Sequence, residues 1–300
     1  MNDFSFPPSA ADAVERVAPS VLGVRVRRGG ACAGIAWRAD TVVTAAAGLG
    51  HGHRAHVVLP DGEAVPATLR GTDPGTDIAV LSVDTKLQPA ERRLDPAPRT
   101  GDFVFATGRD ASGVVHASFG YLGCVAGPWR TWRGAPVDRL LRLDGGLFPG
   151  LMGAPIADAQ GQVLGMASAM LARHHAVVLP VSTIDRVVDQ LLAHGRVARG
   201  HLGVVAQGVA LTSAMREAAG TEAGSGLLVC GVGEDSPAAR AGLLVGDVLL
   251  AAGGKTLGSI EDLRDLLTPD RIGSRLRLQV LRGGAPVELS VEVGEQAPRC

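Results

Sequence analysis

The stretch LFPGLMGAPI, residues 147–156, has the glycine and proline pattern of a tight active-site turn. Gly150 and Gly153 flank two apolar residues, Leu151 and Met152. Glycines spaced in this way let the backbone approach a bound group closely, or let successive N–H groups point at one spot. The residue at the centre is a thioether, which cannot act as a nucleophile because it has no proton to lose. A turn of catalytic shape therefore has an inert side chain at its tip.

The bulk composition predicts a globular chain with two domains. A length of 300 residues is above the size at which a single core stops growing. The shares of 46% hydrophobic and 20% charged residues are typical of globular proteins. A net charge of −1 gives no reason to expect nucleic acid or an acidic membrane as a partner. Because the chain has no run of about 18 apolar residues, we expect no membrane span.

The first twenty residues contain no charged region followed by an apolar stretch, so no signal peptide is expected. This pattern predicts a cytoplasmic location. If the start of the chain is assigned wrongly, the periplasm or cell envelope is the alternative.

Neither a disulfide framework nor a metal site is expected, and no cofactor is predicted. The cysteines are far apart and form no CxxC motif or Cys/His cluster: Cys32, Cys124, Cys230 and Cys300. The first three lie in apolar, strand-like surroundings, which predicts buried thiols. His51 and His53 are interpreted as solvated loop residues, because no third metal ligand accompanies them.

Short apolar or alternating runs separated by turn residues predict a β-barrel or sandwich in the first two thirds of the chain. The expected strands lie at 20–28, 41–47, 55–69, 77–83, 102–108, 162–170 and 176–180. Residues 182–195 break this pattern with a helical apolar stripe. Ser182 with Asp185 predicts a capping box at its start, and Gly195 predicts its end.

A second unit follows this helix. Its expected strands lie at 226–232, 246–252, 275–282 and 287–293, with helices at 236–243 and 259–267. Ser259 and Asp262 form the pattern of another capping box.

The second unit resembles a PDZ domain in the circularly permuted form of bacterial proteases. The stretch SPAARAGLLVGDVLLAAGGKTL, residues 236–257, looks like the heart of such a domain, and RGHLGV, residues 199–204, is similar to its carboxylate-binding loop. A PDZ groove binds an extended chain as an added strand. The resemblance implies peptide contacts from the loop and from the helix that follows: Leu202, Gly203, Val204, Ile260, Leu263 and Leu267. For Leu263 and Leu267, a purely core role is the alternative.

The order of a barrel, a linker helix, RGxLGV and a PDZ unit resembles the HtrA/Deg family of serine proteases over nearly the whole chain. The resemblance implies a mainly β fold, with a trypsin-like double β-barrel followed by a PDZ α+β domain. It further implies an N-terminal segment at 1–19, a protease-homology domain at 20–195, a PDZ domain at 196–296 and a tail at 297–300.

The family's catalytic triad is only partly present in this resemblance. LPDGEAVPATLRGTDPGTDIAVLSVD, residues 59–84, is similar to the stretch around the catalytic aspartate and identifies Asp77. VVTAAAGLG places Ala47 in the position of the histidine, and LFPGLMGAPI places Met152 in that of the serine. Leu151 replaces the asparagine before it.

These replacements predict an inactive protease. Ala47 has no proton acceptor, so Asp77 has no catalytic group to orient. Loss of a triad commonly costs roughly a million-fold in turnover, or about 8 kcal/mol of transition-state stabilisation. The backbone N–H groups of Gly150 and Met152 remain as a vestige of the oxyanion hole.

Other residues are poor substitutes for the missing triad members. The histidines of residues 51–56 follow Ala47 by four or more positions, whereas proton transfer needs heavy atoms within about 2.6–3.2 Å. Ser168 lies in a strand-like run beyond the turn, and not at its tip.

We therefore predict a peptide-binding pseudoprotease that acts as a scaffold, holdase or regulator in protein quality control. Expected partners are unfolded or C-terminal peptide segments and an active HtrA-like relative. Phe4 and Phe6 are candidates for holding a homotrimer together, a role that the resemblance implies. The alternatives are an active endopeptidase with a rearranged active site, and a structural assembly protein whose groove is filled internally.

Overall fold

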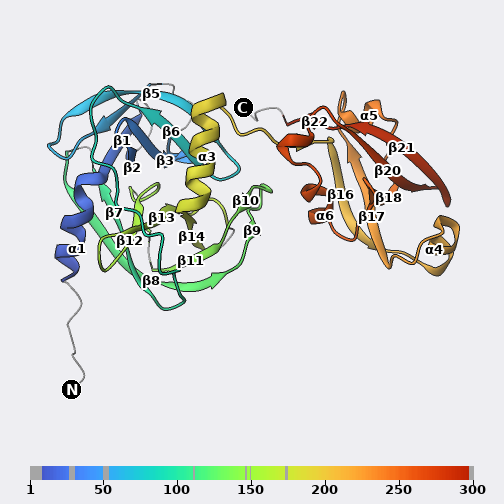
Figure 1. The fold of residues 1–300 in the computed structure, drawn as a ribbon, viewed down its shortest axis with the longest axis horizontal. Coiled ribbons are helices and arrows are strands. Elements are labelled where there is room, and N and C mark those ends of the chain that lie inside the picture. The colour runs from blue at the N-terminus through green and yellow to red at the C-terminus, as the bar shows by residue number, and fades with distance from the viewer. Residues whose placement is uncertain are drawn as a thin grey trace, which may run out of the picture. The chain divides into compact units, whose positions relative to one another are not determined.

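The computed structural model describes residues 9–26, 31–49, 54–110, 112–145, 147–148, 150–172 and 175–296. The chain forms two compact units that divide between Val197 and Ala198 (Figure 1). The expected contributions of Phe4, Phe6, His51, His53 and Cys300 lie outside the described residues.

The first unit begins with a closed antiparallel barrel in the order β1-β2-β3-β6-β5-β4. Its strands are β1 (Val21–Val26), β2 (Ala31–Arg38), β3 (Thr41–Ala45), β4 (Arg54–Val58), β5 (Ala64–Asp73) and β6 (Ile78–Ser82). Mostly alanine, valine and leucine side chains fill its interior, because the side chains of neighbouring strands must fit a narrow core. The expected strand 41–47 is shorter than predicted: it ends at Ala45, and a helical turn, α2 (Ala46–Leu49), follows.

A second closed barrel has the order β11-β14-β13-β12-β7-β8. Its strands are β7 (Phe103–Arg109), β8 (Val115–Ala126), β11 (Leu140–Asp144), β12 (Pro155–Asp158), β13 (Val163–Ser168) and β14 (Ala176–Pro180). The sequence pattern did not predict β2, β8 or β11. A short hairpin of β9 (Trp129–Arg130) and β10 (Pro136–Val137) lies between β8 and β11 in the chain.

Helices pack onto the barrels and join one shared apolar core. These helices are α1 (Ala10–Val17), followed by the short η1 (Ala18–Ser20), and α3 (Val181–His194). Ala13 and Val17 of α1 are buried, so this part of the N-terminal segment belongs to the folded unit. Gly195 adopts a left-handed conformation with φ 71° and ends α3, as predicted.

The predicted capping box of Ser182 and Asp185 is wrong. Helix α3 starts one residue earlier, with Pro180 as its N-cap and without a side-chain capping bond. Asp185 instead accepts hydrogen bonds from Trp37 Nε1 at 2.8 Å and Arg92 Nη1 at 2.7 Å. These tertiary partners occupy the carboxylate that the local pattern assigned to the helix start.

The second unit is an antiparallel sheet in the order β16-β17-β18-β20-β21, with β19 paired to β18. The strands are β16 (Val204–Ala210), β17 (Ser225–Val232), β18 (Val248–Ala252), β19 (Lys255–Thr256), β20 (Arg275–Arg282) and β21 (Ala285–Glu292). A separate pair joins β15 (Gly200–His201) to β22 (Gly294–Glu295). The helices are α4 (Ser213–Ala219), α5 (Pro237–Arg240), α6 (Ile260–Asp265) and the 3-10 turn η2 (Pro269–Arg271).

Helix α6 starts with the predicted capping box. The Ser259 hydroxyl accepts from the Asp262 amide, and the Asp262 carboxylate accepts from the Ser259 amide. Strand β16 and helix α4 were not predicted, because the residues of β16 are only half-buried or exposed and show little apolar alternation.

Candidate functional site

Asp77 lies directly before β6 and joins elements of both barrels. Its backbone has φ 56°, a left-handed conformation in which aspartate is tolerated better than most residues. Its Oδ1 accepts from the Ala47 backbone N–H at 2.8 Å, and its Oδ2 accepts from Ser168 Oγ at 2.7 Å. The structure thus brings Asp77, Ala47 and Ser168 together from α2 and from the end of β13.

Burial raises the pKa of Asp77 above its usual value. The hydrogen bonds from Ala47 and Ser168 oppose this effect, because they stabilise the carboxylate form. Both oxygens of the carboxylate therefore have partners, although burial disfavours its charge.

The turn that carries Met152 packs against the first barrel. Gly153 has φ 79°, and a Cβ there would lie 2.6 Å from the Ala33 carbonyl oxygen and 2.7 Å from the Ala45 amide nitrogen. The Met152 carbonyl accepts from the Ala33 N–H at 2.9 Å. Only glycine fits at 153, because both the space and the backbone conformation exclude a side chain.

The Met152 side chain is half-buried and packs on the apolar cluster that includes Cys32 and Leu49. Ala46 packs on the same cluster. The turn of Met152 and the start of α2 therefore both pack on the core of the first barrel.

Two backbone N–H groups of this turn have no acceptor among the described residues, those of Gly150 and Met152. The intervening Leu151 N–H donates to the Phe148 carbonyl at 3.0 Å. Gly150 has φ 95°, and a Cβ at this position would meet no atom within 4 Å. Open space thus lies in front of the turn at Gly150.

Sequence reasoning placed Ser168 correctly in a strand beyond the glycine turn, but it missed the contact of this residue with Asp77. Its hydroxyl also accepts from the Met170 N–H at 3.1 Å. The Met170 carbonyl in turn accepts from Trp132 Nε1 at 2.7 Å. The only sequence signal was a lone serine at the end of an apolar strand, which carries little information.

Cys32 lies in β2 near this site. Its Sγ is 3.3 Å from Thr44 Oγ1, and burial raises the pKa of its thiol. The predicted burial therefore holds for Cys32. It is wrong for Cys230, which is exposed on β17, and Cys124 is half-buried. The burial of a thiol in a strand depends on which face the sheet covers, which alternation alone did not define.

The other histidines considered at this site do not reach it in the described residues. His56 is exposed on β4, where it pairs in register with Pro66 of β5. Within the described residues, no group of three or more His, Cys, Asp or Glu side chains could hold a metal ion.

In the second unit, the loop of Leu202 and Gly203 is anchored to the start of α5. Gly203 has φ 80°, and a Cβ there would lie 2.2 Å from Ser236 Cβ. The Gly203 carbonyl accepts from the Gly233 N–H at 2.8 Å, and the Leu202 carbonyl accepts from the Ala238 N–H at 2.9 Å. The loop conformation therefore requires glycine at this position.

Strand β16 is at the end of its sheet, and α6 packs beside it. Leu202 and Leu263 are buried in the core of this unit. Val204, Ile260 and Leu267 are only partly buried and pack against that core. Of the residues predicted to contact a peptide, these three therefore keep exposed surface, whereas Leu263 belongs to the core.

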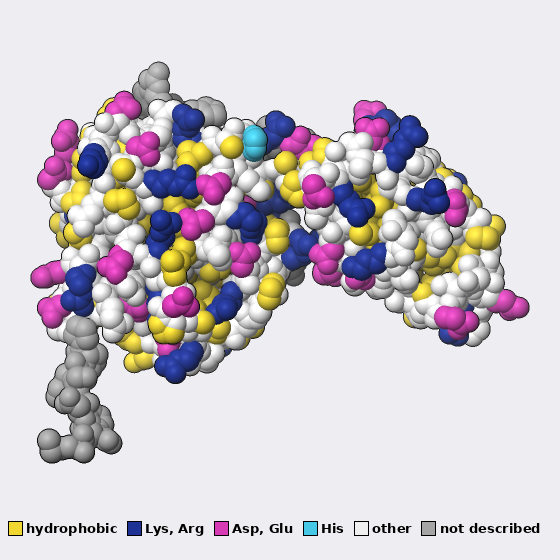
Figure 2. Space-filling model, viewed as in Figure 1, with side chains coloured by type: hydrophobic (Ala, Val, Ile, Leu, Met, Phe, Trp, Pro, Cys, Tyr) yellow, Lys and Arg dark blue, Asp and Glu magenta, His cyan; other side chains and the backbone are white. Residues whose placement is uncertain are grey.

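On the face shown in Figure 2, basic, acidic and apolar side chains alternate over both units. No helix in the described part of the chain is long and apolar enough to cross a membrane.

Comparison with known proteins defines the class of both units. The trypsin-like peptidase domain family matches residues 32–166, and the PDZ domain family matches residues 200–293. The chain is 33% identical over 244 residues to a protein of Pseudomonas putida (strain W619) named probable periplasmic serine endoprotease DegP-like. It is 32% identical over 251 residues to a protein of the same name in Brucella suis biovar 1 (strain 1330). These alignments cover 79% of this chain, and 50% and 47% of the two relatives.

Solved structures give the same result. The HtrA-type protease AlgW with a decapeptide has a TM-score of 0.77 at 26% identity, covering 96% of this chain and 99% of that one. AlgW with a tripeptide has a TM-score of 0.76 at 29% identity, covering 97% and 99%. The chain belongs to the HtrA/Deg family of trypsin-like serine proteases and their homologues, with a trypsin-like double barrel followed by a PDZ domain. It spans about half the length of the curated relatives it matches.

The predicted cytoplasmic location is wrong. The relatives in Pseudomonas and Brucella are named periplasmic, which points to the periplasm. The prediction depended only on the first residues of the chain, and the patterning of folded domains carries no export signal that could have corrected it.

Proposed function

We propose that this chain is a catalytically inactive HtrA homologue that binds peptide segments in the periplasm. In this proposal, Ala47 and Met152 occupy the positions of the family's histidine and serine, and Asp77 is the one triad residue retained. The observation that carries the proposal is the set of partners of Asp77. Its carboxylate accepts from a backbone N–H and from Ser168, and the residue that supplies this N–H is an alanine.

The chemistry of this arrangement explains the lack of turnover that we propose. Acyl transfer needs a nucleophile and a base that accepts its proton. The methyl group of Ala47 and the thioether of Met152 supply neither. Asp77 then serves to tie the start of α2 to the end of β13.

The vestigial turn retains one chemical capacity. The N–H groups of Gly150 and Met152, which have no acceptor among the described residues, are donors of the kind that bind a carbonyl oxygen. We propose that the cleft can hold a peptide carbonyl without cleaving the peptide.

Peptide capture is assigned mainly to the second unit. A chain added to the free edge of β16 would pair with its backbone, while the Leu202–Val204 loop receives a terminal carboxylate. The related AlgW was solved with a decapeptide and with a tripeptide, which supports this class of ligand. We propose that residues 20–195 and 196–296 form the two domains, with α1 packed onto the first of them.

The same proposal extends to partners. Unfolded or C-terminal segments are the expected ligands, which fits a scaffold, holdase or regulator in protein quality control. Co-assembly with an active HtrA-like relative and a homotrimer are also proposed.

The decisive experiment compares casein turnover by the purified wild-type protein with that of a variant carrying Ala47→His and Met152→Ser. We expect the wild type to be silent and the double variant to cut. A matched control adds Asp77→Asn to the double variant and should abolish the new activity, because a restored triad needs its aspartate. Cleavage by the wild type that survives further purification would contradict the proposal and support a rearranged active site.

The binding half of the proposal is tested separately with the wild-type chain. Peptides with a free C-terminal carboxylate should bind, whereas the same peptides with a C-terminal amide should bind at least tenfold more weakly. Absence of binding by either form would favour the structural assembly protein, whose groove is filled internally.

A further inference from the structure

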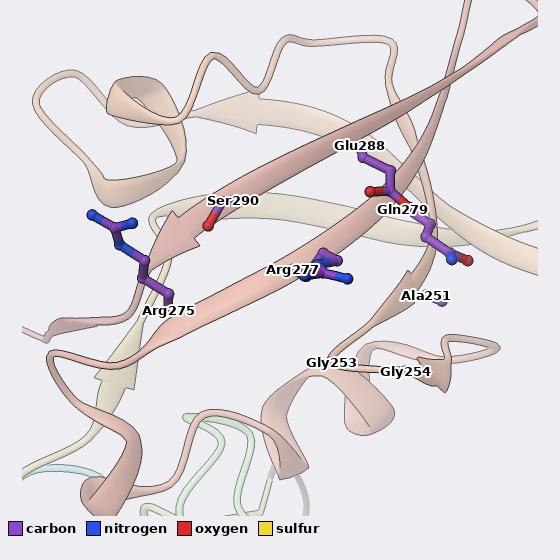
Figure 3. A pocket seen from close by; sticks show the side chains of 8 residues that line it. All are labelled: Ala251, Gly253, Gly254, Arg275, Arg277, Gln279, Glu288 and Ser290. Carbon is purple, nitrogen blue, oxygen red and sulfur yellow. The ribbon is translucent and has the colours of Figure 1, made fainter.

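A hollow of about 560 Å³ lies on the PDZ sheet, away from the strand assigned to peptide capture. Its lining comes from β18, β20, β21 and the turn after β18 (Figure 3). Because the sheet order is β16-β17-β18-β20-β21, none of these strands pairs with β16, and β21 is at the opposite end of the sheet. The hollow is lined by Ala251, Gly253, Gly254, Arg275, Arg277, Gln279, Glu288 and Ser290.

The floor of the hollow is open because its turn carries no side chains. Gly253 and Gly254 have φ 57° and 81°, and the Gly253 N–H donates to the Arg277 carbonyl at 2.8 Å. A Cβ on Gly253 would lie 3.0 Å from Leu276 Cδ1, whereas one on Gly254 would meet no atom within 4 Å. The turn of Gly253 and Gly254 therefore lies close to the backbone of β20, and the turn has no side chain of its own that could fill the hollow.

Arg275 and Arg277 supply the charge of the hollow. Both are exposed, and neither guanidinium has an ion-pair or hydrogen-bond partner among the described residues. The guanidinium of Arg271 lies nearby, with Nη1 3.7 Å from the place of a Gly253 Cβ. The carboxylate within the lining is Glu288, which faces Gln279 in the strand register.

One carboxylate borders this surface. Glu292 faces Arg275 across β20 and β21, without an ion pair between the two among the described residues. Among the residues that line the hollow, two arginines thus face one carboxylate.

The two guanidinium groups lie at separate points along β20 and do not converge (Figure 3). Alternate residues of a strand are about 6.5–7 Å apart, which is also the spacing of same-face side chains in an extended ligand. A single phosphate cannot bridge the two guanidinium groups, because they do not converge. Two carboxylates that lie two residues apart in an extended chain have the same spacing as the two arginines.

We propose that this hollow binds an extended acidic segment of another protein, with Asp or Glu at alternate positions. Arg275 and Arg277 pair with successive carboxylates, and Gln279 and Ser290 hydrogen-bond the intervening backbone. This site needs no chain terminus, so it is independent of the carboxylate-binding loop. A protein held at β16 by its C-terminus and here by an internal acidic segment would be bound at two places, which raises its avidity.

The test uses the full chain and a labelled peptide of five Glu-Ser repeats, acetylated at its N-terminus and amidated at its C-terminus. The capped ends prevent capture by the carboxylate-binding loop. Fluorescence anisotropy at 25 mM salt should show saturable binding that weakens at least fivefold at 300 mM salt. A Gln-Ser peptide with the same caps should not bind.

Matched variants separate the proposed site from general charge. Arg275→Ser with Arg277→Ser should weaken binding of the acidic peptide at least fivefold. The control, Arg25→Ser with Arg70→Ser, removes two exposed strand arginines from the other unit. It should change the affinity for the acidic peptide less than twofold. Glu288→Gln should tighten binding about twofold, because it removes a like charge from the hollow.

Three results would overturn the proposal: no saturable binding, equal weakening by both arginine pairs, or complete competition by 10 mM inorganic phosphate. An unchanged unfolding midpoint of each variant excludes loss of fold as the cause. Because the probe lacks a free C-terminus, failure of this proposal leaves the proposed capture of C-termini untouched.

Discussion

At the scale of single residues, the carboxylate of Asp77 is buried and hydrogen-bonded, and no cationic side chain of the described residues forms an ion pair with it. In a working triad, such an aspartate orients an imidazole and stabilises its charged form. Here its two oxygens hold Ala47 and Ser168, residues of different barrels. These two hydrogen bonds link the two barrels, whether or not Asp77 has a catalytic role.

Replacement of Asp77 by Asn should therefore alter the pH dependence of stability. Burial raises the folded-state pKa of Asp77, so the folded protein holds its proton more strongly than the unfolded chain. Stability contributed by this group then falls as the pH rises from the unfolded pKa through the folded pKa. Asp77→Asn removes this penalty and can still accept from the Ala47 N–H.

We expect the difference in unfolding free energy, variant minus wild type, to increase from pH 4 to pH 8 in urea titrations. Ser168→Ala is the matched variant: it removes a donor to the charged form and should destabilise the protein by about 1–3 kcal/mol at pH 7. A pH-independent difference for Asp77→Asn would show that the buried charge costs no stability.

At the scale of elements, a polar contact near the start of α3 attaches this helix to β2 of the first barrel. Asp185 accepts from Trp37 Nε1, and Arg92 both pairs with Asp185 and lies 5.1 Å from the Trp37 ring centroid. The apolar stripe of α3 drives the docking, and this polar cluster defines where the helix lies along β2.

Asp185→Ala should destabilise the first unit by about 1–3 kcal/mol, because it leaves the indole N–H of the buried Trp37 without an acceptor. Asp189→Ala on the same helix is the control. Its side chain is 65% exposed in a surface pair with Arg38, so its loss should cost less than about 1 kcal/mol. Thermal unfolding monitored by circular dichroism measures both, and equal losses would contradict the assigned role of the Trp37 contact.

At the scale of the whole molecule, an aromatic cluster on the second barrel is relevant to the proposed homotrimer. Phe119 and Tyr121 of β8 are 47% and 56% exposed. Their ring centroids lie 6.0 Å and 5.8 Å from that of Phe103. Exposed aromatic groups gathered at one place are typical of a surface that another chain covers.

Phe119→Ser combined with Tyr121→Ser should therefore shift the protein from trimer to monomer in sedimentation velocity at micromolar concentration. Leu94→Ser is the control, because Leu94 is 75% exposed and lies outside this aromatic cluster. A monomeric wild type would contradict the proposed homotrimer. An unchanged trimer in the double variant would contradict a role of Phe119 and Tyr121 in holding it together.

The sequence by itself determined the features that depend on neighbouring residues. The capping box of Ser259 and Asp262 and the end of α3 at Gly195 were predicted, because each depends on short-range spacing and turn chemistry. The family and the fold class were predicted from the resemblance of sequence motifs to a known family, and both are confirmed.

Only the tertiary structure decided the contacts between distant segments. Ser168 meets Asp77 across 91 positions, and Asp185 meets Trp37 across 148, where it replaces a predicted local cap. The exposure of Cys230 likewise depended on which face of β17 the sheet covers. Local spacing cannot define such partners, because a polar side chain bonds to whichever group the packing of the two barrels and their helices brings within reach.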